Sequence, residues 1–236
     1  MTTRTSPGDE MPPGKPCSTS YLIFGASLRA GSFNKRLASL AAAVVAEAGG
    51  TVVTASMSDF DCPSYNGDIE ASEGIPAGAD RFRSKLVSTD GLIISSPEYN
   101  ASMPGCLKNA IDWTSRIKPQ PFNGKQACLL SASPSMVGGN RGLWSLRIPL
   151  EHLGARVYPD MFSLAQAHEA FDDAGRIRND LLRKRFETML QCFVDLVEAA
   201  KHYPGIKKEW VEFLGEHPNA ATDRTEVVAM DKSAAA

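Results

Sequence analysis

The sequence predicts an α/β protein, a three-layer αβα sandwich around a five-stranded parallel sheet. Short apolar runs, typical of strands buried on both faces, alternate with segments of helical periodicity. This alternation favours right-handed crossovers and therefore parallel strands. A chain of 236 residues, of which 43% are hydrophobic, can bury a large core within one domain.

The first strand is expected at residues 20–25, before a polar loop and a helix at 34–48. The apolar residues of that helix share one face, and Gly49 and Gly50 end it. Residues 51–56 are β-branched and predict the second strand, whereas residues 59–67 have the composition of a loop. Further helices are expected at 76–88, from Pro104, at 143–153 and at 178–200, and further strands at 91–96, 126–131 and 155–158.

Two tails flank the expected domain, which covers residues 19–200. Residues 1–18 are polar and proline-rich, so we expect a disordered N-terminal tail without a signal peptide. Residues 201–236 form a C-terminal extension with one possible short helix at 206–214. No run approaches the roughly 20 apolar residues that a membrane span requires, so a cytoplasmic protein is the expectation.

Charge and cysteine usage exclude several classes of function. The 25 basic and 27 acidic residues give a formal charge of −2, which does not favour binding to nucleic acid or to an anionic membrane. The five cysteines contain no C-x-x-C pair and have no histidine cluster nearby, so they predict reduced thiols and no metal site. Chemistry on small molecules is the remaining expectation.

The loop after the first strand has the composition of a phosphate cradle. Ser27, Arg29, Ser32 and Asn34 can surround an anion, and free backbone N–H groups at the following helix start point the same way. The glycines of a dinucleotide fingerprint and the Gly-Lys-Ser/Thr ending of a P-loop are absent, so a monophosphate such as that of FMN fits better than a pyrophosphate. The alternative is that the serines and the asparagine only cap the helix and that Arg29 is a surface charge. A capping role does not require an arginine, so Arg29 separates the two interpretations.

Two further loops are expected at the same edge, because ligands of open α/β sheets bind beyond the carboxyl ends of the strands. Residues 97–103 follow the third strand, and residues 133–141, which include Gly138 and Gly139, follow the fourth. Each loop also has a simpler interpretation. The first could be only a polar turn before a helix, and the two glycines could only mark a tight turn.

These three segments together resemble the flavodoxin-like NAD(P)H-dependent FMN reductases, a family that includes quinone, chromate and azo-dye reductases. The resemblance runs from about residue 20 to residue 200. It implies strand order 2-1-3-4-5, FMN as cofactor and NADPH or NADH as co-substrate. By resemblance, the FMN-binding residues are Ser27, Arg29, Ser32, Phe33, Asn34, Pro97, Glu98, Tyr99, Asn100, Ser133, Gly138 and Gly139.

The resemblance also implies a ping-pong cycle. NAD(P)H gives hydride to flavin N5 and leaves, and a quinone, chromate, an azo- or nitro-aromatic compound or free flavin then accepts the electrons, without a catalytic side chain. Arg141 and Trp144 could line the rim as substrate-binding residues, or be a solvated arginine and a core tryptophan. Glu98 could orient its loop, or pair with Lys108 or Arg116 across the contact of a dimer or tetramer.

Two other classes of protein remain open at this point. A flavodoxin-type single-electron carrier would share the fold, although such carriers usually have a strongly acidic docking face and this chain is nearly neutral. A nucleotide sensor or scaffold without FMN is the second alternative. The colour of the purified protein separates this last class from the others.

Overall fold

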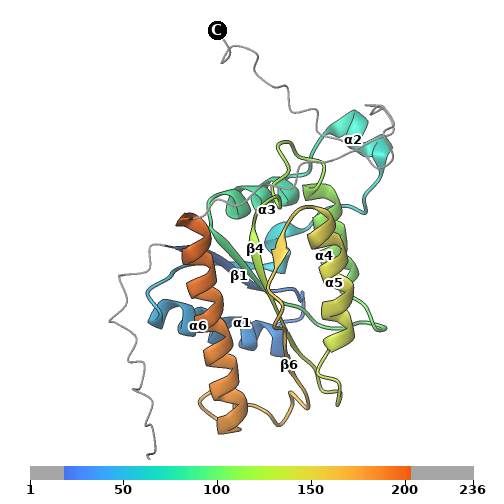
Figure 1. The fold of residues 1–236 in the computed structure, drawn as a ribbon. Helices are drawn as coiled ribbons and strands as arrows, with labels where there is room; N and C mark the ends of the chain where they lie inside the picture. Colours follow the sequence, from blue (N-terminus) through green and yellow to red (C-terminus); the bar gives the residue numbers. More distant parts are fainter. Residues whose placement is uncertain (1–18, 203–236) are drawn as a thin grey trace, which may run out of the picture.

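The computed structural model describes residues 19–202 as a parallel sheet between two layers of helices (Figure 1). The strands are β1 (Ser20–Gly25), β2 (Thr51–Ser56), β3 (Gly91–Ser95), β4 (Gln126–Ala132), β5 (Arg156–Val157) and β6 (Phe162–Leu164). Their order is β2-β1-β3-β4-β5, and every pair is parallel. The predicted three-layer sandwich and the order 2-1-3-4-5 are confirmed.

The far edge of the sheet differs from the prediction, because residues 19–202 form six strands and not five. β5 pairs with Gln126 and Ala127 at the start of β4, and β6 pairs with Leu130–Ala132 at its end, so the two short strands share one edge. Pro159 lies between them. Proline has no N–H group to give to a ladder, which ends the predicted strand 155–158 early and makes β6 a separate strand.

Five of the helices correspond to predicted ones: α1 (Phe33–Glu47), α3 (Ala77–Val87), α4 (Gly105–Thr114), α5 (Asn140–His152) and α6 (Asp180–His202). α5 begins three residues before the predicted start at residue 143, and α6 continues two residues past the predicted boundary at 200. Two helices were not predicted: a 3-10 helix, η1 (Met57–Phe60), overlaps the start of the predicted loop, and a short helix, α2 (Gly67–Glu73), begins at its last residue. The side chain of Asn66 caps α2 by accepting a hydrogen bond from the backbone of Asp68. The expected tail 1–18, and the possible helix 206–214, lie outside the described residues.

Each face of the sheet has its own hydrophobic core. Tyr21 and Ile23 of β1 point toward α1 and α6, whereas Leu22 and Phe24 point toward the layer of α3, α4 and α5. In Figure 1, α6 and α5 accordingly flank the sheet on opposite sides. The alternation places an apolar side chain on both faces, which explains why the strand is a continuous apolar run in the sequence.

One buried side chain fastens the start of α1 to the ends of two neighbouring strands. The amide of Asn34 is 2% exposed. Its Oδ1 accepts hydrogen bonds from the backbone N–H of Ala132 and from the hydroxyl of Ser95, each at 2.9 Å. Its Nδ2 donates to the carbonyl of Ala132 at 2.8 Å. The loop after β1 is therefore held directly against the ends of β3 and β4.

We predict that Asn34→Ala lowers the free energy of unfolding by about 2–3 kcal/mol, because it leaves three buried polar groups without a partner. Urea unfolding followed by circular dichroism measures the change. Ser39→Ala is the matched control, since the hydroxyl of Ser39 lies on the exposed face of the same helix and donates to the carbonyl of Lys35. Equal effects of the two substitutions would contradict the role of Asn34.

Candidate active site at the carboxyl edge of the sheet

The loop between β1 and α1 combines an exposed arginine with two nearly buried serines. Ser27 is 4% exposed and Ser32 is 6% exposed. Arg29 is exposed, and its guanidinium makes no hydrogen bond or ion pair with any residue in the range 19–202. The start of α1 adds backbone N–H groups with no partner within the helix. Hydroxyls, an unpaired guanidinium and a helix N-terminus together suit a phosphate group.

Several predicted cradle residues also have structural roles. Ser32 is the N-cap of α1, and its hydroxyl accepts a hydrogen bond from the backbone N–H of Asn34 at 3.2 Å. Capping is therefore confirmed for Ser32, although a hydroxyl that accepts one hydrogen bond can still donate another. The amide of Asn34 faces the sheet. The ring of Phe33 is half-buried and stacks on Phe171, with centroids 6.2 Å apart, so it packs against the core on that side.

The loop after β3 ends in a tight two-residue turn. Tyr99 and Ser102 pair through their backbones, and the two residues between them, Asn100 and Ala101, have positive φ angles of 51° and 62°. An alanine in this conformation is strained, because its Cβ lies close to the following carbonyl. The side chain of Tyr99 is 54% exposed at the base of the turn. The polar turn is thus present, and the contact of Tyr99 and Asn100 with flavin stays a prediction.

The side chain of Glu98 is only 8% exposed, and it pairs within its own chain. One carboxylate oxygen accepts a hydrogen bond from Nε of Arg141 at 2.9 Å and forms an ion pair with Nη2 of the same guanidinium at 2.7 Å. The suggested partners Lys108 and Arg116 instead pair with Asp112 and Glu70. Of the two interpretations of Glu98, the structure supports the one in which it orients its loop.

The third loop approaches the sheet closely at its two glycines. Gly138 and Gly139 have φ angles of 64° and 87°, and a Cβ on Gly139 would lie 2.0 Å from the hydroxyl oxygen of Ser131. The tight-turn interpretation accounts for both glycines. Ser133 accepts a hydrogen bond from the backbone N–H of Ser135 at 3.2 Å. Contact of Ser133, Gly138 and Gly139 with flavin remains a prediction.

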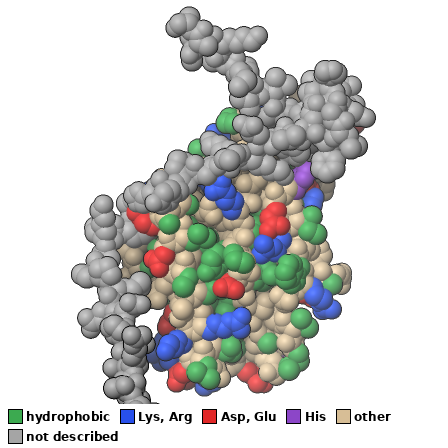
Figure 2. Space-filling model, viewed as in Figure 1, with side chains coloured by type: hydrophobic (Ala, Val, Ile, Leu, Met, Phe, Trp, Pro, Cys, Tyr) green, Lys and Arg blue, Asp and Glu red, His purple; other side chains and the backbone are tan. Residues whose placement is uncertain are grey.

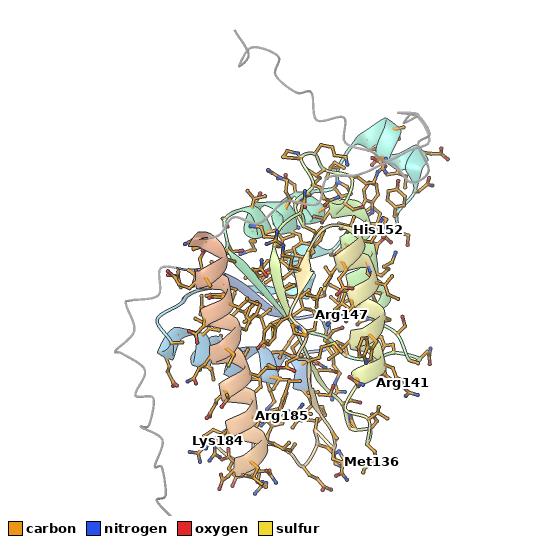
Figure 3. The ribbon with its side chains drawn as sticks, in the orientation of Figure 1. Met136, Arg141, Arg147, His152, Lys184 and Arg185 are labelled. Carbon is orange, nitrogen blue, oxygen red and sulfur yellow. The ribbon has the colours of Figure 1, made fainter. Side chains whose placement is uncertain are left out.

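The two predicted rim residues lie on the first turns of α5. Arg141 is exposed, and in Figure 3 it lies at the same end of the molecule as Met136 of the third loop, far from His152 at the other end of the helix. Trp144 is 57% exposed, so its interpretation as a core tryptophan is wrong. The guanidinium of Arg147 lies over its ring, 5.6 Å from the centroid.

A cavity that the sequence did not predict opens beside the cradle. Its volume is about 570 Å³, and Leu28 of the cradle loop lines it together with Met57, Tyr65, Cys106 and Asn109. Burial raises the pKa of the Cys106 thiol, which disfavours the reactive thiolate. Among residues 19–202, no cluster of three or more potential metal-ligating side chains occurs, and no helix is long and apolar enough to cross a membrane.

Comparison with known proteins decides the family. Residues 19–169 match the family described as NADPH-dependent FMN reductase. The chain belongs to this family. The NAD(P)H-dependent FMN reductase PA1204 of Pseudomonas aeruginosa is 39% identical over 168 residues, which cover 70% of this chain and 88% of that protein. A quinone reductase of Escherichia coli is 40% identical over 131 residues, 56% of this chain and 69% of that protein.

The comparison of structures agrees with the family assignment. The flavoenzyme FerB of Paracoccus denitrificans, an NAD(P)H:(acceptor) oxidoreductase, superposes with a TM-score of 0.65 at 26% sequence identity. The match covers 77% of this chain and 98% of FerB. As a member of the FMN reductase family, this chain is an oxidoreductase with FMN as its cofactor.

The residues of the cradle fit the phosphate of FMN. Ser27 and Ser32 supply hydroxyl groups, and Arg29 is a cation with no partner within residues 19–202. The remaining protein groups of the cradle are neutral donors, so one dianion would meet one full positive charge and the positive end of a helix dipole. The donor set matches a terminal monophosphate.

We predict that Arg29→Ala weakens FMN binding by about 1.5–3 kcal/mol, or tenfold or more, because a charge-assisted hydrogen bond to phosphate is lost. Quenching of flavin fluorescence by the apoprotein measures the dissociation constant. Riboflavin, which has no phosphate, is the control ligand, and its affinity should be the same for both proteins. An equal loss for riboflavin would remove Arg29 from the phosphate site.

Proposed function

We propose that this FMN reductase oxidises NAD(P)H and reduces quinones, using one site for donor and acceptor in turn. The observation that carries the proposal is the convergence of the cradle, the 97–103 loop and the 133–141 loop on one edge of the sheet. FMN held by these three loops would supply the hydride chemistry at its N5 atom. The names of the related quinone reductases favour quinones over chromate, azo- or nitro-aromatic compounds and free flavin.

The residues of the chain would bind the cofactor, orient its ring and shield it from water. Arg29 would hold the phosphate, and the backbone of Pro97, Tyr99 and Asn100 would border the ring. The exposed side chains of Arg141 and Trp144 would form the rim that substrates cross. A cation and an aromatic ring on neighbouring helical turns suit a co-substrate that combines anionic phosphates with a flat nicotinamide.

We predict parallel double-reciprocal lines when NADPH or NADH and a quinone are varied together. The physical reason is that one open ring face between two loops has no room for donor and acceptor at once, so each must leave before the other binds. Steady-state assays with a soluble benzoquinone measure the pattern. Intersecting lines would indicate a ternary complex and contradict the alternation.

A single-electron carrier is the second candidate, and surface charge argues against it. Figure 2 shows acidic and basic side chains interspersed on the visible face, with no acidic patch on it. This agrees with a formal charge of −2 for the whole chain. We predict that excess NADPH or NADH bleaches the flavin within the turnover time in a stopped-flow experiment. A carrier would bleach far more slowly and would accumulate a semiquinone.

We also propose a cytoplasmic enzyme that associates as a dimer or tetramer. The proposal follows from the family resemblance and from a charge that does not favour nucleic acid or membranes. α4 lies next to the cradle and exposes the charged side chain of Lys108, whereas its large apolar side chains, Leu107, Ile111 and Trp113, are buried in the core, so the association rests on the family resemblance. Light scattering at micromolar concentration tests the association, and a monomer at every concentration would contradict it.

A further inference from the structure

Glu98 lies in the 97–103 loop, yet its carboxylate accepts hydrogen bonds from the first turn of α5. The side chain is only 8% exposed, whereas that of its partner Arg141 is 59% exposed. The second carboxylate oxygen accepts the backbone N–H of Gly142 at 3.1 Å. The N–H groups in the first turn of a helix have no partner within it, and the N-cap of α5 is Gly139, which has no side chain. Glu98 therefore caps α5 from another loop.

The two segments also approach each other at the level of the backbone. A Cβ on Gly142 would lie 3.1 Å from Cα of Glu98 and 3.2 Å from the carbonyl oxygen of Ser102. The hydroxyl of Ser145 adds a second connection, because it accepts the N–H of Met103 and donates to the carbonyl of Gly142, each at 2.8 Å. Contacts on both sides of the 99–102 turn thus hold it against α5.

The turn held in this way is strained. Asn100 and Ala101 both have positive φ angles, which cost energy for residues with a Cβ. Strained backbone persists only where the surrounding structure determines it, and it is common at ligand-binding sites. The Glu98 and Ser145 contacts supply that constraint.

We propose that Glu98 is a positioning residue and not a ligand of FMN. Its carboxylate already accepts two hydrogen bonds from α5, one from Arg141 and one from Gly142, and forms an ion pair with a second nitrogen of Arg141. These bonds keep the strained turn and the third loop, which leads into α5, in one fixed arrangement before FMN binds. The consequence for FMN rests on the function proposed above, whereas the contact itself is a property of the chain without cofactor.

The test compares amide hydrogen exchange and flavin binding in four variants of the full chain. Glu98→Ala removes both hydrogen bonds and the ion pair, and Glu98→Gln retains an acceptor for Gly142 but loses the charge. Gly142→Ala keeps the carboxylate and separates the two backbones. Glu151→Ala is the matched control, because Glu151 forms an exposed ion pair with Arg147 at the other end of α5.

In the apoprotein, we expect amides 99–103 and 140–143 to exchange about tenfold faster or more in Glu98→Ala and Gly142→Ala, with Glu98→Gln intermediate and Glu151→Ala unchanged. The dissociation constants of FMN and riboflavin should both rise about tenfold or more in Glu98→Ala, since the defect concerns the ring loop and not the phosphate cradle. The loss of affinity for both flavins distinguishes Glu98 from Arg29, because replacement of Arg29 should weaken the binding of FMN and not that of riboflavin.

Three results would overturn the proposal. Unchanged local exchange in Glu98→Ala would show that the contact does not hold the turn. Faster exchange throughout β1 and β3 would show a general loss of stability. Weaker flavin binding with unchanged exchange would make Glu98 a direct ligand. If the unaltered protein binds no FMN, the proposed function fails, and the exchange measurement on the apoprotein still decides the role of Glu98.

Discussion

The hydrogen bonds of Asn34 are the constraint on which the site depends. An amide buried in a core is costly unless its polar atoms have partners, and both atoms of this amide bind groups at the ends of β3 and β4. β1, β3 and β4 are neighbours in the sheet, so their loops already share an edge. The hydrogen bonds of Asn34 add a second constraint, because they fix where α1 begins relative to the loop after β4.

The polar residues at the carboxyl edge of the sheet fall into two groups. One group is buried and holds the loops in place, and the other is exposed to solvent. Asn34 and Glu98 are buried or nearly so, and their polar atoms bind other parts of the chain. Arg29 and Tyr99 are exposed at the same loops. The buried set determines the geometry, and the exposed set is the one that a ligand can reach. Residue type alone does not separate the two sets.

Local patterns predicted the elements well because the strands are continuous apolar runs and the long helices have clear periodicity. β1 and β2 have the predicted bounds. β6 was missed, since three residues give too little periodicity to recognise. The exposure of Trp144 was left undecided, because its position next to Leu143 fits either face of a helix until the sheet is placed.

The candidate site was predictable as a set of loops but not as a set of contacts. The order of strands brings the three loops together by a general rule for parallel sheets. By contrast, Glu98 and Arg141 are separated by 43 positions, and nothing local indicates that one neutralises the other. Asn34 has the composition of a helix cap or a phosphate ligand, and only the tertiary structure shows that its amide faces the sheet.

Two thiols with shifted pKa values line the cavity beside the cradle, but burial raises the pKa of both Cys62 and Cys106, which disfavours a reactive thiolate. Burial alone would also raise the pKa of Asp90, but hydrogen bonds from Ser20 and the charge of Lys201 lower it, and Asp90 precedes β3 at the opposite end of the strand. Enzymes that rely on side-chain acids and bases concentrate such shifts at their active sites. Here the protein contributes position and charge, as expected where a bound flavin supplies the redox chemistry.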